Sequence, residues 1–216
     1  KDAKVPIQLK VNTGMNRFGI RPSEIYRALT IIDKYKLNLV GIYSHNATSN
    51  KNIIKQQEEA FFYAIKNVYN IDIHFAATSL IDEENPLYIS KRIGAGIYEN
   101  ALSVYGKIIK INYVYKDEYI GYDYSFQMKE DGYIGVIDLG YADGLERCCE
   151  GFMVYINNNY YKLVGKSCMN HSFVLIDSKV KIYDEVHFIS LKNNINNYIS
   201  FFGKIKHEIY LRFFFI

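Results

Sequence analysis

The chain has 216 residues, of which 49% are hydrophobic and 23% are charged, and its formal net charge at pH 7 is +3. These values are typical of a globular protein of one or two domains, and they exclude a disordered chain. The net charge is too small, and the basic residues too scattered, to indicate nucleic acid as a partner. No apolar run reaches the ~18 residues of a membrane span, so we expect no membrane partner.

The three cysteines show neither a disulfide framework nor a metal site. Cys148 and Cys149 are neighbours, and Cys168 stands apart. Neither the odd count nor the spacing matches disulfide pairing or metal ligation. The sequence therefore predicts free thiols, no metal and a reducing, cytoplasmic location.

Strands and helices alternate over the first hundred residues. Strands are predicted over 5–11, 39–43 and 71–75, helices from Pro22-Ser23-Glu24 onward and over 51–69, and a fourth strand end with a glycine-rich turn over 91–98. This order predicts a parallel sheet whose functional groups lie at the strand C-termini. Four such units are half of an eight-stranded barrel. Because residue 1 is also lysine rather than methionine, we expect a piece of a longer protein, with a partial barrel over 1–100.

The second half of the chain has a different pattern, in which strands follow one another closely. They are predicted over 103–115, 119–126, 133–139, 151–156, 160–166, 171–176 and 184–190. Asn157-Asn158-Asn159 marks a hairpin turn, and a short helix is predicted over 195–202. Residues 101–216 are therefore expected to form an antiparallel β domain.

Each strand end in the first half carries a polar group. They are Lys10 and Arg17 after the first strand, His45 after the second, Thr78 and Ser79 after the third, and Arg92 beside Gly94 and Gly96 in the fourth. Strand ends of one barrel converge on one mouth, and arginines, hydroxyls and glycine N–H groups together suit a phosphorylated, anionic ligand. Taken singly, each residue has a plainer explanation, such as a surface charge, a turn histidine or a helix cap.

Tyr141 stands on a turn at the end of a predicted strand. The apolar run 134–139 stops at Gly140-Tyr141-Ala142-Asp143-Gly144, whose glycines and aspartate favour a turn. A tyrosine held there can present its phenol to a cavity. A phenol ordinarily loses its proton at a pH of about 10. A tyrosine can therefore act as a base at neutral pH only where its surroundings favour the phenolate. Packing remains the alternative for any one of 21 tyrosines.

Five motifs in order resemble those of alanine racemases. Residues 10–19, Lys-Val-Asn-Thr-Gly-Met-Asn-Arg-Phe-Gly, resemble Lys-x-Asp-Thr-Gly-Met-x-Arg-x-Gly, and Ser-His-Asn-Ala-Thr (44–48) resembles Thr-His-Phe-Ala-Thr. Residues 92–98 are similar to Arg-x-Gly-Ile-x-x-Tyr, and 140–144 match the family's catalytic tyrosine motif. Val-Gly-Lys-Ser-Cys-Met-Asn (164–170) resembles Val-Gly-Arg-x-Cys-Met-Asp. The ordered set covers nearly the whole chain.

The resemblance implies a pyridoxal-phosphate (PLP) enzyme that acts as a homodimer with shared active sites. Tyr141 would be the base on the L-alanine face, reaching the partner subunit's site. A hydrogen-bonded chain through His45 to Arg92 would stabilise the phenolate that acts as the base. Arg17 and the Met169 N–H would hold the substrate carboxylate.

The resemblance also assigns residues to the cofactor. Arg92 would meet the pyridine nitrogen, where a protonated guanidinium leaves the ring uncharged and suppresses side reactions such as transamination. Thr78, Gly94 and Ala95 would contact the phosphate. Lys10 matches a position that is carbamylated in some members, where it orients the substrate-binding arginine.

The chain departs from the family pattern in several places. The lysine that binds PLP covalently, and is the base on the D-alanine face, lies in a Val-Lys-Ala-Asn-Ala-Tyr-Gly-His-Gly motif that has no counterpart here. Residues 1–216 alone are therefore expected to be inactive. Thr78 replaces the usual serine, and Ala77 the usual asparagine. If Lys206-His207-Glu208-Ile209 is aligned with Asn-x-Tyr-Glu-Ile, Phe215 falls where some members have a gate tyrosine.

The resemblance thus predicts an alanine racemase: the C-terminal half of a (β/α)8 TIM-type barrel, followed by a β domain, that supplies D-alanine for peptidoglycan. A racemase for serine or a broader set of amino acids remains an alternative, because the substrate pocket is only partly present. A non-catalytic remnant that associates with a full-length partner is a second one, against which the retained side chains argue. A PLP-binding homeostasis barrel is disfavoured, because such proteins lack the β domain.

Overall fold

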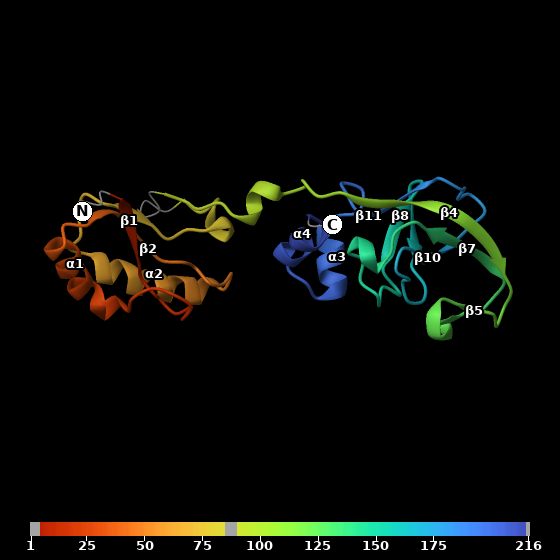
Figure 1. The fold of residues 1–216 in the computed structure, drawn as a ribbon, viewed down its shortest axis with the longest axis horizontal. Helices are drawn as coiled ribbons and strands as arrows, with labels where there is room; N and C mark the ends of the chain where they lie inside the picture. The colour runs from red at the N-terminus through yellow and green to blue at the C-terminus, as the bar shows by residue number, and fades with distance from the viewer. Residues whose placement is uncertain (1–4, 85–89, 215–216) are drawn as a thin grey trace. The chain divides into compact units, whose positions relative to one another are not determined.

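The structure, a computed structural model, describes residues 5–84 and 90–214. The chain divides into two compact units, Lys1–Ile97 and Tyr98–Ile216 (Figure 1). We call them the N-terminal and the C-terminal unit. The first is a parallel α/β unit and the second an antiparallel β unit, which agrees with the predicted partial barrel and β domain.

The N-terminal unit contains three parallel strands in the order β1-β2-β3. Their bounds are Pro6–Lys10 for β1, Asn38–Tyr43 for β2 and Asp72–His74 for β3. The short 3-10 helix η1 (Pro22–Glu24) leads into α1 (Ile25–Lys34), and α2 (Lys51–Ile65) connects β2 to β3. The Asn50 side chain caps α2 by accepting hydrogen bonds from the Asn52 and Ile53 N–H groups. The predicted parallel strands and the helix that opens at Pro22 are confirmed.

Two expectations for this unit are wrong. Helix α2 ends at Ile65 rather than at 69, and Asn70 then turns the chain with a φ of 58°. No strand forms over 91–94; a 3-10 helix, η3 (Ala95–Tyr98), follows instead. The Arg92 N–H donates to the Ala76 carbonyl at 3.1 Å, but a strand needs a ladder of such bonds. Glycine-rich sequence around Gly94 favours the turn over the ladder.

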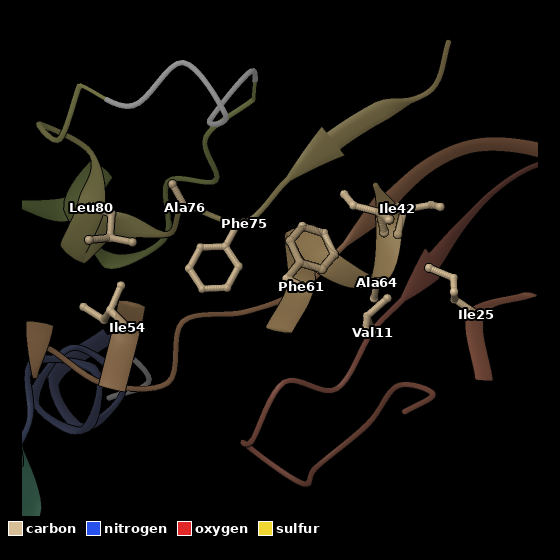
Figure 2. Packing of buried hydrophobic residues seen from close by; sticks show 10 residues of the cluster. Val11, Ile25, Ile42, Ile54, Phe61, Ala64, Phe75, Ala76 and Leu80 are labelled. Carbon is tan, nitrogen blue, oxygen red and sulfur yellow. The ribbon is translucent and has the colours of Figure 1, made fainter. Parts of the chain in front are cut away.

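The core of the N-terminal unit lies between α2 and the strands. Phe61 of α2 and Phe75, just beyond β3, are both fully buried, with ring centroids 5.9 Å apart. Figure 2 shows these two rings side by side, with Val11 and Ile42 from the strand region nearby. This packing holds the strand ends, and the polar residues that follow them, in fixed positions.

The C-terminal unit is built around a six-stranded antiparallel sheet in the order β10-β7-β4-β11-β8-β9. The strands are β4 (Val104–Val114), β7 (Gly132–Ile137), β8 (Met153–Ile156), β9 (Asn159–Lys162), β10 (Ser172–Ile176) and β11 (Glu185–Ile189). An isolated antiparallel bridge connects Leu163, the residue after β9, to Val174 of β10, so the two ends of this strand order meet. The sheet therefore curls back on itself around buried residues such as Ile137 and Val186.

Most of the second-half predictions are confirmed, including the helix α3 (Ile195–Phe202). Asn157 and Asn158 have positive φ values of 45° and 68°, as a tight turn between paired strands requires. The predicted strand over 119–126 is wrong. It is two short strands, β5 (Tyr119–Ile120) and β6 (Phe126–Gln127), separated by the 3-10 helix η4 (Tyr122–Tyr124), because Asp123 adopts a φ of 59°.

The helix α4 (Lys206–Phe214) was not predicted. It begins after Gly203, which ends α3 with a φ of 62°. Phe215, the expected counterpart of a gate tyrosine, lies outside the described residues. In the part of the chain that the structure describes, no helix is long and apolar enough to cross a membrane.

Candidate functional site

Arg92 joins the polar groups at the ends of β2 and β3. Its Nη2 donates to the Ser44 carbonyl at 2.6 Å and to the Phe75 carbonyl at 3.4 Å, and lies 3.3 Å from His45 Nδ1. Partial burial lowers the pKa of Arg92, but guanidinium pKa values start so high that the group stays protonated at neutral pH. The structure thus brings together Arg92 and His45, two residues that the sequence placed at one site.

Tyr43, the last residue of β2, lies under this cluster of cations. The Arg92 guanidinium carbon is 5.1 Å, and the Lys10 Nζ 5.8 Å, from the centroid of its ring. The His74 ring stacks on Tyr43 with centroids 4.9 Å apart and an interplanar angle of 9°, and His74 Nε2 lies 2.7 Å from Gln8 Oε1. Contacts of this kind between cations and a ring face are attractive, and they limit how far Arg92 and Lys10 can move.

The cluster has a strongly positive electrostatic environment. Burial, followed by the charges of Arg92, Arg17 and Lys10, lowers the pKa of His45, so the imidazole is neutral at pH 7. Burial, followed by the charges of Arg17 and Arg92, lowers the pKa of Lys10. Arg17 is exposed, and its charge is a cause of both shifts. The site is therefore suited to an anionic ligand.

Thr78, Gly94 and Ala95 form a second part of the site. The Gly94 N–H donates to Thr78 Oγ1 at 2.9 Å, and Ala95 begins η3 immediately afterwards. A Cβ at Gly96 would lie 2.7 Å from Thr78 Cγ2. Gly96 is therefore needed for the close approach of this turn to the Thr78 side chain, whereas a Cβ at Gly94 would lie at an ordinary 3.6 Å from Thr78 Oγ1.

In the C-terminal unit, the structure brings Tyr141 and Met169 together. Tyr141 begins the 3-10 helix η5 (Tyr141–Asp143), and its N–H donates to the Cys168 carbonyl at 3.0 Å. The next N–H, of Ala142, donates to the Met169 carbonyl at 2.9 Å. Both side chains are exposed, Tyr141 by 42% and Met169 by 56%. Tyr141 and Met169 are 28 positions apart in the sequence, yet they lie on one surface.

The close pairing of these two loops depends on Gly140. A Cβ at this position would lie 2.5 Å from the Cys168 carbonyl oxygen, and closer still to that of Met169. We expect Gly140→Ala to lower the free energy of unfolding by about 1–3 kcal/mol, because the added methyl forces the backbones apart. Urea denaturation measures this. Gly132→Ala is the control, since its nearest neighbour at 3.3 Å is the flexible end of Met128; equal loss in both variants would contradict the account.

Sequence reasoning missed Tyr43, Asn46 and His74. Asn46 is 5% exposed, and it donates from Nδ2 to Ser79 Oγ at 2.6 Å. The sequence does show that these three residues lie next to strand ends. Apolar alternation and short motifs do not, however, reveal which residues contact one another across a sheet. The partners of these residues lie more than thirty positions away or, for His74 and Tyr43, on a neighbouring strand.

The residues present fit a ligand that combines a hydrogen-bond acceptor with an anionic group. Arg92 Nε is buried and has no hydrogen-bond partner among residues 5–84 and 90–214. A buried donor left without an acceptor is costly and is rare in proteins. Thr78 and the turn that contains Gly94 and Gly96 lie in close contact. They offer a hydroxyl and backbone N–H groups beside an excess of positive charge.

Comparisons with known proteins cover both units. Residues 1–99 match the family model described as alanine racemase, N-terminal domain, and residues 101–213 match alanine racemase, C-terminal domain. An alanine racemase of Borreliella burgdorferi (strain ZS7) is 32% identical over 95% of this chain and 63% of the relative. The chain thus spans less than two thirds of the relatives that it matches.

Solved structures show the same fold. The alanine racemase of Bartonella henselae, with covalently bound pyridoxal phosphate, has a TM-score of 0.87 at 22% identity over 97% of this chain and 64% of that one. A histidine racemase of Leuconostoc mesenteroides has a TM-score of 0.76 at 18% identity, with coverage of 97% and 64%. The fold is therefore found in racemases named for different amino acids.

Proposed function

Because the chain belongs to the alanine racemase family, we propose that the protein that carries it interconverts L-alanine and D-alanine with pyridoxal phosphate as cofactor. The observation that carries the proposal is the setting of Arg92. It is fixed by the Ser44 carbonyl and His45, while its buried Nε has no partner among the described residues. D-alanine for peptidoglycan is the proposed use of the product.

Arg92 and the Thr78 segment are proposed to hold the cofactor. The Arg92 Nε donor suits the pyridine nitrogen, and Thr78, Gly94 and Ala95 suit the phosphate. When bound, pyridoxal phosphate supplies an electron sink that acidifies the α-proton of an amino acid. Arg92, being always protonated, does not give its proton to the ring, so it orients the ring without making it cationic.

Tyr141 is proposed to move the α-proton on the L-alanine face. Its exposed phenol is carried on a turn whose backbone is tied to the Met169 loop, so the base and the Met169 N–H have fixed relative positions. Arg17 and that N–H are proposed to hold the substrate carboxylate. Because the Arg92 guanidinium donates to His45 Nδ1, a neutral His45 carries its proton on Nε2 and can donate it to the phenolate form of the tyrosine.

The proposed assembly is a homodimer in which Tyr141 of one chain serves the Arg92 site of the other. The motif resemblance supports this arrangement, as does the presentation of Tyr141 at an exposed turn rather than in the core of its own unit. Three free cysteines support a reducing, cytoplasmic location.

Lys10 is proposed to react with carbon dioxide to form a carbamate. Its lowered pKa increases the fraction of neutral amine, the form that attacks carbon dioxide and then releases a proton. The product exchanges a cation for an anion beside Arg17, whose guanidinium it can orient. Carbon-13 NMR of the intact protein under labelled carbon dioxide detects the carbamate, and a Lys10→Ala variant with an unchanged signal would exclude this lysine.

The proposed reaction is tested with the intact protein, purified with pyridoxal phosphate. L-alanine and L-serine are supplied separately, and the D-enantiomers are resolved by chiral chromatography. We expect D-alanine to form faster than D-serine and to need the cofactor. Binding of pyridoxal phosphate without any D-amino acid product would favour a non-catalytic remnant, and faster D-serine production would favour the broader racemase.

A further inference from the structure

Asn46 connects the loop after β2 to the loop after β3. Its Nδ2 donates to Ser79 Oγ at 2.6 Å, and its Oδ1 accepts the Ala77 N–H at 3.1 Å. The side chain is 5% exposed, so water does not compete effectively for these bonds. The two contacts are made on either side of Thr78, the residue proposed to bind the cofactor phosphate.

The loop after β3 needs this support. Ala77 is extended, with φ −114° and ψ −173°, and precedes the 3-10 helix η2 (Thr78–Leu80). The Leu80 N–H closes that turn on the Ala77 carbonyl at 2.9 Å. The Ala77 N–H, in contrast, points away from the turn and takes its acceptor from Asn46.

Asn46 is itself held in place. The N–H of the next residue, Ala47, donates to Oε1 of Gln57 at 3.3 Å, and Gln57 is 4% exposed on α2. Asn46 Nδ2 also lies 3.5 Å from the Thr48 carbonyl. The amide is therefore a fixed support rather than a mobile surface group.

Two departures from the motifs quoted above fall on these same residues. Position 46 is phenylalanine in the Thr-His-Phe-Ala-Thr motif, and position 77 is ordinarily asparagine; this chain has asparagine at 46 and alanine at 77. In this chain, the Asn46 amide supplies the hydrogen bonds to a loop in which residue 77 has no polar side chain.

We infer that Asn46 is a positioning residue for the phosphate site: it holds residues 77–79 so that the Thr78 hydroxyl and the Gly94 N–H stay aligned. The inference rests on the proposed function for the identity of the anion. Asn46 does not contact the anion itself; it acts through the Ala77 and Ser79 contacts.

The test compares Asn46→Ala with Asn50→Ala in the intact protein. Asn50 caps α2 and has no described contact with residues 77–79, so its loss destabilises the unit without touching the phosphate loop. Pyridoxal phosphate is titrated into each apoprotein, and hydrogen exchange of the Ala77 amide is followed by NMR. We expect Asn46→Ala to weaken binding about tenfold relative to Asn50→Ala and to speed Ala77 exchange at least as much, as loss of a buried hydrogen bond implies.

A second variant separates loss of the hydrogen bonds from loss of side-chain bulk. Asn46→Phe keeps a bulky side chain but neither hydrogen bond, so it is also expected to weaken pyridoxal phosphate binding. If Asn46→Ala fails to fold, Ser79→Ala removes the Nδ2 partner instead, and a severalfold weaker affinity is expected.

Equal pyridoxal phosphate affinity in Asn46→Ala and Asn50→Ala, with an unchanged Ala77 exchange rate, would overturn the inference. If the wild-type protein binds no pyridoxal phosphate, the proposed function fails, and the Ala77 exchange comparison alone decides whether Asn46 holds the loop. The two failures are therefore distinguishable.

Discussion

Tyr141→Phe is expected to lower alanine racemisation in both directions by about 10²–10⁴-fold, the range that a positioned acid–base group contributes. The change removes only the phenolic oxygen and leaves the Tyr141 N–H bond to Cys168 in place. Racemisation needs a proton removed on one face and returned on the other, so loss of one base stops both directions. Initial rates from L-alanine and from D-alanine measure the effect.

Two further readouts separate a catalytic from a structural role for Tyr141. Affinity for pyridoxal phosphate should stay close to that of the wild type, and exchange of the α-proton of D-alanine in deuterated water should survive, because a different base serves that face. Tyr122→Phe, an exposed tyrosine of the same unit, is the control and should be fully active. Loss of cofactor binding in Tyr141→Phe would instead point to a structural role.

Arg92→Lys is expected to lower pyridoxal phosphate affinity by about 10–100-fold and to lower racemisation at least as much. Arginine presents several N–H donors in a fixed plane, while lysine is a single point charge. Lysine cannot keep the contacts with the Ser44 and Phe75 carbonyls and with His45 while offering a donor in place of Nε. Leaving the buried Ser44 carbonyl without the Arg92 donor costs about 1–3 kcal/mol.

The Arg92 variant is assessed by cofactor titration together with urea denaturation. Arg27→Lys, on the exposed side of α1, is the control, for which neither quantity should change. A variant that keeps full cofactor affinity would show that the partnerless Nε is not a cofactor donor. A variant whose free energy of unfolding falls while its cofactor affinity is unchanged would show that Arg92 is only a structural link between the β2 and β3 loops.

Local sequence rules predicted the parts of the fold that local chemistry determines. Asparagines at 157–158 turn the β8–β9 hairpin because they tolerate positive φ, and Pro22 opens the first helical segment because its fixed φ suits a first turn. The prediction of a fourth strand in the N-terminal unit was wrong, because a strand depends on contacts that are not local. A strand exists only through its neighbour, and 91–94 form no ladder in the structure.

Some residues of the candidate site could be predicted from the sequence, and others could be found only in the structure. Arg92 and His45 could be named from strand ends and motifs, and the structure places them in contact. Asn46 could not, because its role depends on contacts with residues 31 and 33 positions away. Met169 and Tyr141 were each found by motif, but their shared surface depends on the backbone pairing that Gly140 allows.

The central claim, that Tyr141 and Arg92 act at one racemase site supplied by two chains, is tested most directly with mixed dimers. Chains carrying Tyr141→Phe and chains carrying Arg92→Lys are co-expressed with different affinity tags, and the mixed species is purified through both. Each parent dimer should be nearly inactive. The mixed dimer contains one site with both residues intact, so we predict about half the wild-type rate. A mixed dimer as inactive as its parents would contradict the account, since that is the result expected if each chain supplied both residues of its own site.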